Sequence, residues 1–214
     1  MNLNEQFVIT ISREVGSGGR TIGRELAARL GVPYCDKDLI NALVEKFGIS
    51  AGNIEQIKGQ KKNWVLDALQ RFSPDPHAGA AGMPRREVAP GITTDDVFHV
   101  ESEVLKAIAG QQSCVIAGRS GFFILKDQPN IINIFIRSSL SNRIARVMQR
   151  QQKDEKEAEK IIERVDSLRE NYIRRYTGTS RYDARNYDLV LNVDGLGTGQ
   201  AVDIILDFIK AGHK

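Results

Sequence analysis

A glycine-rich loop between an apolar run and an amphipathic run, near the start of the chain, constrains the fold more than any other feature of the sequence. Residues 7–11 are apolar and β-branched, which predicts a strand buried on both faces, as in parallel sheets. Further along, Ile22, Leu26 and Leu30 recur every four residues, so they share one face of a predicted helix. Strand, glycine-rich loop and helix therefore follow one another directly.

Strand-like runs alternate with helical patterns along the rest of the chain. Alternation of this kind predicts an α/β fold, with a parallel sheet covered by helices on both faces. The further strands are predicted at 32–35, 113–117, 131–136 and 187–192, and the further helices at 38–48, 97–108, 141–176 (with a break near 153–155) and 201–209.

The glycine-rich loop predicts a phosphate-binding site. A helix N-terminus offers free N–H groups and a partial positive charge, and glycines let the backbone wrap closely around an anion. The hydroxyl group of Thr21 is a candidate ligand for Mg²⁺. The residues that we assign to this site are Gly16, Ser17, Gly18, Gly19, Arg20 and Thr21.

The loop departs from the Walker A pattern G-x-x-x-x-G-K-S/T, and two registers are open. In the first register, Glu14 replaces the first glycine and Arg20 replaces the lysine. In the second register, Arg13 stands at the first glycine and Gly19 at the lysine. We favour the first because it keeps a cation beside the phosphates, and the planar guanidinium group of Arg20 can bind two phosphate oxygens.

Two other interpretations of the loop stay open. One is a turn that needs its glycines only for tightness. The other is a dinucleotide-binding loop, for which Asp36 or Asp38 would supply the acidic residue, although Thr21 stands at the place of the third glycine.

Composition and charge narrow the class of protein. The chain has 214 residues, of which 41% are hydrophobic and 27% charged, as is typical of a globular domain. Its formal net charge of +3 is too small to argue for nucleic acid as a partner. Cys35 and Cys114 adjoin apolar runs, which predicts buried thiols in a reducing compartment. Without a signal-peptide pattern or a membrane-length apolar run, we expect a cytoplasmic protein.

Four segments carry a resemblance to a known family. They are residues 9–20 continued by 36–40, the run 115–119 that ends in the pair Gly118-Arg119, the spacing Glu163-x-x-Asp166-x-x-Arg169, and the run 186–191. These segments resemble the cytidylate kinase-like family, a branch of P-loop proteins similar to bacterial CMP kinases. The resemblance spans nearly the whole chain and is weakest in residues 50–95.

The resemblance implies a three-layer P-loop NTPase fold with a parallel sheet, a helical acceptor-binding insertion and an arginine-rich lid. The core would comprise 6–37, 96–140 and 186–214, the insertion about 38–95, and the lid about 150–185. The implied activity is transfer of the γ-phosphoryl group of ATP, with Mg²⁺, to CMP, dCMP or a related nucleoside monophosphate.

The resemblance also implies roles for single residues. The loop would hold the donor phosphates, Asp36 would contact the acceptor near its sugar, and Arg119 would bind the acceptor phosphate. Asp166 and Arg169 would close over the site. Arg20, Arg119 and Arg169 are therefore the catalytic candidates, because phosphoryl transfer needs aligned reactants and positive charge around the moving oxygens. From the residues alone, Asp36 is also placed to cap the next helix.

The chain departs from CMP kinases at three places, so other functions stay open. The P-loop lysine is missing, no Walker B Asp ends the run 113–117, and Ala117 and Ser120 stand where acidic residues normally flank the Gly-Arg pair. The residue after that Arg helps CMP kinases to recognise cytosine, so the sequence leaves undecided which base the acceptor nucleotide carries. The alternatives are a P-loop kinase for another small acceptor, a non-catalytic nucleotide-binding regulator, and a nucleic-acid-binding module.

Overall fold

The computed structural model describes residues 1–46, 48, 50 and 93–212, and these residues form a parallel sheet covered by helices. Every strand pair is parallel, and the strand order is β2-β3-β1-β4-β5. The predicted α/β class, with a parallel sheet covered by helices, is confirmed. The strands are β1 (Val8–Arg13), β2 (Tyr34–Cys35), β3 (Cys114–Ala117), β4 (Ile131–Arg137) and β5 (Leu189–Asn192).

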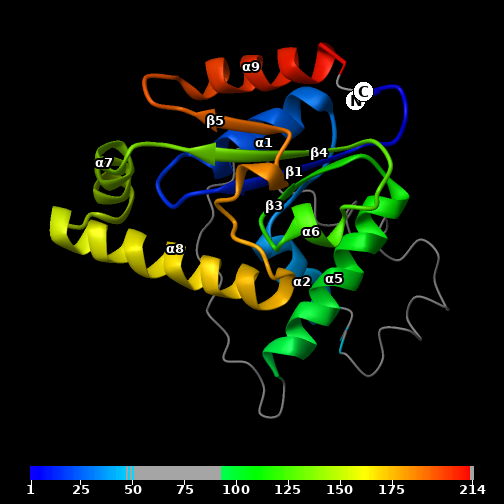
Figure 1. The fold of residues 1–214 in the computed structure, drawn as a ribbon, viewed down its shortest axis with the longest axis horizontal. Helices are drawn as coiled ribbons and strands as arrows, with labels where there is room; N and C mark the ends of the chain where they lie inside the picture. Colours follow the sequence, from blue (N-terminus) through cyan, green and yellow to red (C-terminus); the bar gives the residue numbers. More distant parts are fainter. Residues whose placement is uncertain (47, 49, 51–92, 213–214) are drawn as a thin grey trace.

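Helices cover both faces of the sheet (Figure 1). One face carries α1 (Gly19–Leu30) and α9 (Thr198–Lys210), and the other carries α2 (Lys37–Lys46), α5 (Thr94–Gln111) and the short α6 (Gly121–Ile124). Beyond the carboxyl end of β4 lie α7 (Leu140–Gln151) and α8 (Glu155–Thr177), and a 3-10 turn (Ala184–Asn186) leads into β5.

The central strand β1 shows why its sequence is apolar at nearly every position. Ile9 and Ile11 pack into the cluster that includes Leu26 of α1, whereas Val8 packs into the cluster that includes Leu105 of α5. Side chains of a strand alternate between the faces, so a strand with helices on both sides needs apolar residues in both sets.

The observed elements differ from the predicted ones mainly at their ends. The predicted break in 141–176 is confirmed, because Gln152 ends α7 with φ 53° and the Asp154 side chain caps α8. Strand β1 runs two residues further than predicted, because Arg13 still lies opposite Ile136 of β4. Most of the predicted insertion, from 51 to 92, lies outside the described residues. None of the described helices is long and apolar enough to cross a membrane.

The packing of α1 on the sheet positions the glycine-rich loop, so we expect it to be sensitive to cavities. Leu26 is fully buried, whereas Leu168 of α8 has 59% of its surface exposed. Replacing Leu26 with Ala is expected to lower the free energy of unfolding by about 2–5 kcal/mol, because it leaves a cavity in the core. The Leu168→Ala variant should stay within about 0.5 kcal/mol of the parent in urea unfolding. Equal losses in the two variants would contradict this packing.

Candidate functional site

The glycine-rich loop turns from β1 into α1 with two residues in the left-handed region. Gly16 and Gly18 have φ of 80° and 84°, and Gly18 is the N-cap of α1. A Cβ atom on Gly16 would lie 2.6 Å from the carbonyl oxygen of Arg143, so the loop also needs glycine there for space. The buried Ser17 hydroxyl donates to the carbonyl oxygen of Glu14 at 2.9 Å, which closes the turn. The loop thus presents the N-terminus of α1 at the carboxyl edge of the sheet.

Three arginines of α7 hold this loop from outside. Arg143 Nε donates to the Val15 carbonyl oxygen at 2.7 Å, and Arg146 donates to the Ser17 carbonyl oxygen at 2.5 Å. Arg150 donates to the Thr21 hydroxyl at 3.0 Å. The three arginines are spaced by three and four residues, so they lie on one side of the helix. These arginines were not predicted from the sequence, although their spacing of three and four residues is a detectable signal.

The carboxylate of Asp166 on α8 joins α7 and α8 to the glycine-rich loop. Asp166 is buried on α8, where it pairs with Arg143 of α7 and lies 3.3 Å from Arg181. Its Oδ1 atom also accepts a hydrogen bond of 3.2 Å from the backbone N–H of Val15 in the loop. One carboxylate thus fixes two arginines and the loop backbone. Its oxygens face these groups in the structure. Contact of Asp166 with a substrate remains a prediction.

Two further arginines converge on the end of β1. Arg169 lies 3.7 Å from Asp166 and donates to the carbonyl oxygen of Arg13 at 3.3 Å, and Arg181 donates to the same oxygen. Burial, together with the like charges of Arg13 and Arg181, lowers the pKa of Arg169 to about 10. The site therefore concentrates positive charge at the carboxyl edge of the sheet.

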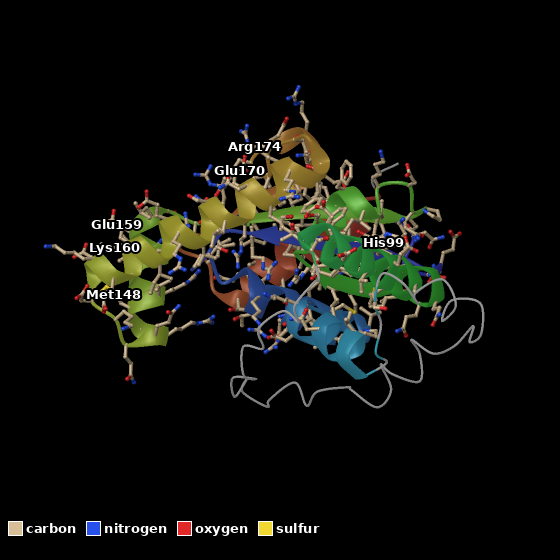
Figure 2. All side chains as sticks on the ribbon, turned by 90° about the horizontal axis from the view of Figure 1, so that it is seen from below. His99, Met148, Glu159, Lys160, Glu170 and Arg174 are labelled. Atoms are coloured by element: carbon tan, nitrogen blue, oxygen red, sulfur yellow. The ribbon has the colours of Figure 1, made fainter. Side chains whose placement is uncertain are left out.

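Not every arginine of the predicted lid faces this edge. Figure 2 shows Glu159 and Lys160 near Met148 of α7, and Glu170 and Arg174 further along α8. Arg174 pairs with Glu170 at 2.5 Å and its side chain is 65% exposed, so it forms a surface ion pair. At the same end of α8, Arg175 pairs with Asp95 of α5 at 2.9 Å.

The predicted loop cation, Arg20, points toward two carboxylates. Its guanidinium group lies 2.9 Å from Asp36 and 2.6 Å from Asp38. Burial opposes the charged form, but these carboxylates raise the pKa of Arg20 overall. Asp36 is buried, and its Oδ1 atom accepts from the N–H of Asp38 at 3.1 Å, so it caps α2. Phosphate contact by Arg20 and acceptor contact by Asp36 both remain predictions.

The Gly-Arg pair forms a strained corner after β3. Gly118, Arg119 and Ser120 all have positive φ, at 81°, 56° and 54°. Left-handed backbone at a residue other than glycine costs about 1–3 kcal/mol and is concentrated at functional sites. Arg119 pairs with the buried Glu101 of α5 at 2.5 Å, and Tyr172 of α8 donates to the same carboxylate at 3.2 Å. Glu101, which holds Arg119, had no signal in the sequence.

The residues around the loop fit a polyphosphate better than they fit a metal ion at Thr21. At the end of β1, four guanidinium groups (Arg13, Arg143, Arg169, Arg181) accompany two carboxylates (Glu14, Asp166), which leaves two positive charges in excess, and Arg146 and Arg150 on the loop add two more. The Thr21 hydroxyl accepts from Arg150, and a guanidinium group there disfavours Mg²⁺. Among the described residues, no group of three or more His, Cys, Asp or Glu could hold a metal ion.

A family model described as the cytidylate kinase-like family matches residues 8–195. The chain belongs to the cytidylate kinase-like family. The predicted resemblance to this family is therefore confirmed, and the matched range includes β1, the glycine-rich loop and α1. No protein with a curated description matches the chain.

Solved structures support the fold of this family member. An uncharacterized protein from Eubacterium ventriosum superimposes with a TM-score of 0.71 at 24% identity, covering 97% of this chain and 100% of that one. A shikimate kinase from Bacteroides thetaiotaomicron gives 0.53 at 14% identity, over 96% and 99% of the chains. A gluconokinase from Sinorhizobium meliloti 1021 gives 0.51 at 15% identity, over 96% and 93%. At these identities the likeness concerns the fold alone.

Loss of the central carboxylate is expected to destabilise this kinase-like domain. In an Asp166→Ala variant, Arg143 and Arg181 remain buried without a counter-charge. We expect the free energy of unfolding to fall by about 3–5 kcal/mol, as for a buried ion pair that loses one partner. Chemical denaturation at neutral pH measures the change.

The matched control for this prediction is Glu163→Ala, one turn earlier on α8. Glu163 is exposed, so its loss is expected to change stability by no more than about 0.5 kcal/mol. A stable Asp166→Ala variant would show that the arginines find other partners.

Proposed function

We propose that this chain is a phosphotransferase that passes the γ-phosphoryl group of ATP to a small acceptor, and that the acceptor is a nucleoside monophosphate, with CMP or dCMP the first to test. The observation that carries the proposal is the excess of guanidinium groups between the glycine-rich loop and the Gly118-Arg119 corner. Both features lie at the carboxyl ends of parallel strands, where α/β sheets bind ligands.

In the proposed reaction, the protein aligns two phosphates and stabilises charge. The N-terminus of α1 and the loop amides bind the donor phosphates, and Arg119 binds the phosphate of the acceptor. An acceptor oxygen forms a bond to the γ-phosphorus while the bond to the bridging oxygen of ADP breaks. In this proposal Arg169 and Arg181, which both donate to the carbonyl oxygen of Arg13, offset the charge that spreads over the moving oxygens.

Family membership favours a nucleoside monophosphate, and one feature of the corner leaves the base open. The Ser120 hydroxyl is buried and has no hydrogen-bond partner among the described residues. A buried hydroxyl without a partner is costly, so Ser120 offers a hydrogen bond to an acceptor. It occupies the position that helps CMP kinases to recognise cytosine, and a serine there also suits a different base.

A second candidate is a kinase for a small acceptor that carries a hydroxyl group and no phosphate. It is favoured by the corner, where Ala117 and Ser120 replace the acidic residues expected beside a cytosine-reading Arg. Shikimate kinase and gluconokinase share the fold, so such acceptors suit the architecture.

A panel of acceptors tests the proposal. The protein is incubated with ATP and Mg²⁺ and with CMP, dCMP, UMP, AMP, GMP, shikimate or gluconate, and ADP release and phosphorylated products are measured. Fastest release with a nucleoside monophosphate supports the proposal. Release with a sugar acid alone supports the second candidate. Nucleotide binding without release for any acceptor would replace both with a regulatory role.

We predict that the Arg119→Lys variant will use the acceptor poorly. Lysine keeps a positive charge beside Glu101 but loses the planar fork that binds two phosphate oxygens. The expected result is about a 10-fold lower kcat/KM for the acceptor, with thermal stability close to that of the parent. Steady-state kinetics with varied acceptor measures the effect.

Arg29→Lys is the control for this experiment. Arg29 is at the far end of α1, where it pairs with Glu25 and Asp203. We expect its kinetics to match the parent. Parental kinetics in the Arg119→Lys variant as well would remove Arg119 from the acceptor site.

A further inference from the structure

Positions 13 and 19 compete for the same space. A Cβ atom on Gly19 would lie 2.6 Å from the Cβ and 3.1 Å from the Cγ of Arg13. Real Cβ atoms do not approach other heavy atoms this closely, so a side chain at position 19 is excluded while position 13 holds an arginine. The Walker A pattern, in the second register, has the opposite arrangement, with glycine first and the long cationic side chain at the later position.

The side chain of Arg13 crosses from the loop to the corner after β3. Its guanidinium group lies against Gly118, where any Cβ atom would collide with it. The side chain of Arg13 therefore packs over Gly19 and Gly118, and the absence of a Cβ atom at both positions makes room for it. Its charge lies between the glycine-rich loop and Arg119, which is the space between a donor and an acceptor in the proposed function.

The guanidinium group of Arg13 has no carboxylate within ion-pair distance among the described residues. Burial and the like charges of Arg181 and Arg20 lower its pKa, whereas the more distant carboxylate of Asp36 opposes this shift without forming an ion pair with it. Besides Asp36 Oδ2, which faces Arg20 and Arg24, three polar atoms on neighbouring residues are also buried without hydrogen-bond partners in the described part of the chain: Tyr34 Oη, Arg20 Nε and Arg181 Nε. A buried cation beside other cations is costly unless an anion accompanies it.

Arg20, in contrast to Arg13, has carboxylate partners at ion-pair distance. It lies 2.9 Å from Asp36 and 2.6 Å from Asp38, and Arg24 lies 3.6 Å from Asp36, so two carboxylates balance two guanidinium groups. The charge of Arg20 is therefore paired at close range, whereas Arg13 forms no ion pair among the described residues and has Asp36 only as a more distant counter-charge.

We propose that Arg13, and not Arg20, supplies the cation of the phosphate loop, and that it binds the terminal phosphates of the nucleotide donor. The chain has exchanged the glycine and the cation of the Walker A pattern between positions 13 and 19, so the cation reaches the phosphates from the end of β1 instead of from α1. This inference rests on the proposed function for the identity of the donor, and on the geometry of Arg13 for the anion site.

The test compares four variants for binding of ATP and of inorganic tripolyphosphate, by calorimetry and by the shift of the melting temperature. They are Arg13→Met, Arg20→Met, Gly19→Lys and the double variant Arg13→Gly with Gly19→Lys. Arg13→Met keeps the apolar stem over Gly19 and removes the charge. We expect it to weaken both ligands about 10- to 100-fold, as for a lost charge-assisted hydrogen bond.

The comparison of Gly19→Lys with the double variant, which exchanges the glycine and the cation between positions 13 and 19, tests the proposal most directly. Gly19→Lys alone is expected to lower the melting temperature, because its side chain meets Arg13. The double variant removes this collision and returns a cation, so we expect ligand affinity within about 10-fold of the parent and a restored melting temperature. Arg13→Met itself should melt no lower than the parent, because it replaces an uncompensated cation with an apolar group.

Each other outcome separates this inference from the proposed function. Parental affinity in Arg13→Met, a larger loss in Arg20→Met, or a marked fall in the melting temperature of Arg13→Met would overturn the role of Arg13. If tripolyphosphate binds in an Arg13-dependent way while ATP is not turned over, the anion site stands and the phosphotransferase proposal fails. If the parent binds neither ATP nor tripolyphosphate, both fail.

Discussion

A single buried carboxylate connects the parts that make up the candidate site. Asp166 pairs with Arg143 of α7 and Arg181 after α8, and it accepts from the Val15 N–H in the glycine-rich loop. A buried ionised group persists only when several donors compensate for its lost hydration. The loop, α7 and α8 therefore depend on one another. The same carboxylate that accepts from the loop backbone also fixes the positions of Arg143 and Arg181.

Much of the fold follows from patterns that are local in the sequence. Two-sided apolar runs identify the strands, and apolar spacing identifies the long helices, because both reflect burial against the sheet. The four-residue α6 and the 3-10 turn have too few residues to show a period. The extension of β1 to Arg13 depends on its pairing with Ile136 of β4, which is a contact between distant segments.

The candidate site was predictable in its location and less so in its pairings. Arg119 and Arg169 do lie at the carboxyl edge of the sheet, as the family's motifs imply. Their partners come from elsewhere in the chain: Glu101 of α5 holds Arg119, and the carbonyl oxygen of Arg13 accepts from Arg169. The choice between the two registers of the loop was beyond the sequence, because each register leaves one arginine near the phosphates. Our proposal of the second register rests on the shared volume of positions 13 and 19 and on the ion pairs of Arg20, neither of which can be read from the sequence.

The distribution of charge explains how ligand and lid depend on each other. On one side of the site Arg20 and Arg24 are balanced by Asp36 and Asp38, and on the other Arg119 is balanced by Glu101. Between these neutral flanks, Arg169 and Arg181 both donate to the carbonyl oxygen of Arg13. Their mutual repulsion opposes this arrangement, so a polyphosphate that bound there would stabilise these guanidinium groups and their contacts with the loop together. If α8 is the lid of the proposed phosphotransferase, anion binding and lid closure would favour each other, which suits a reaction that must exclude water.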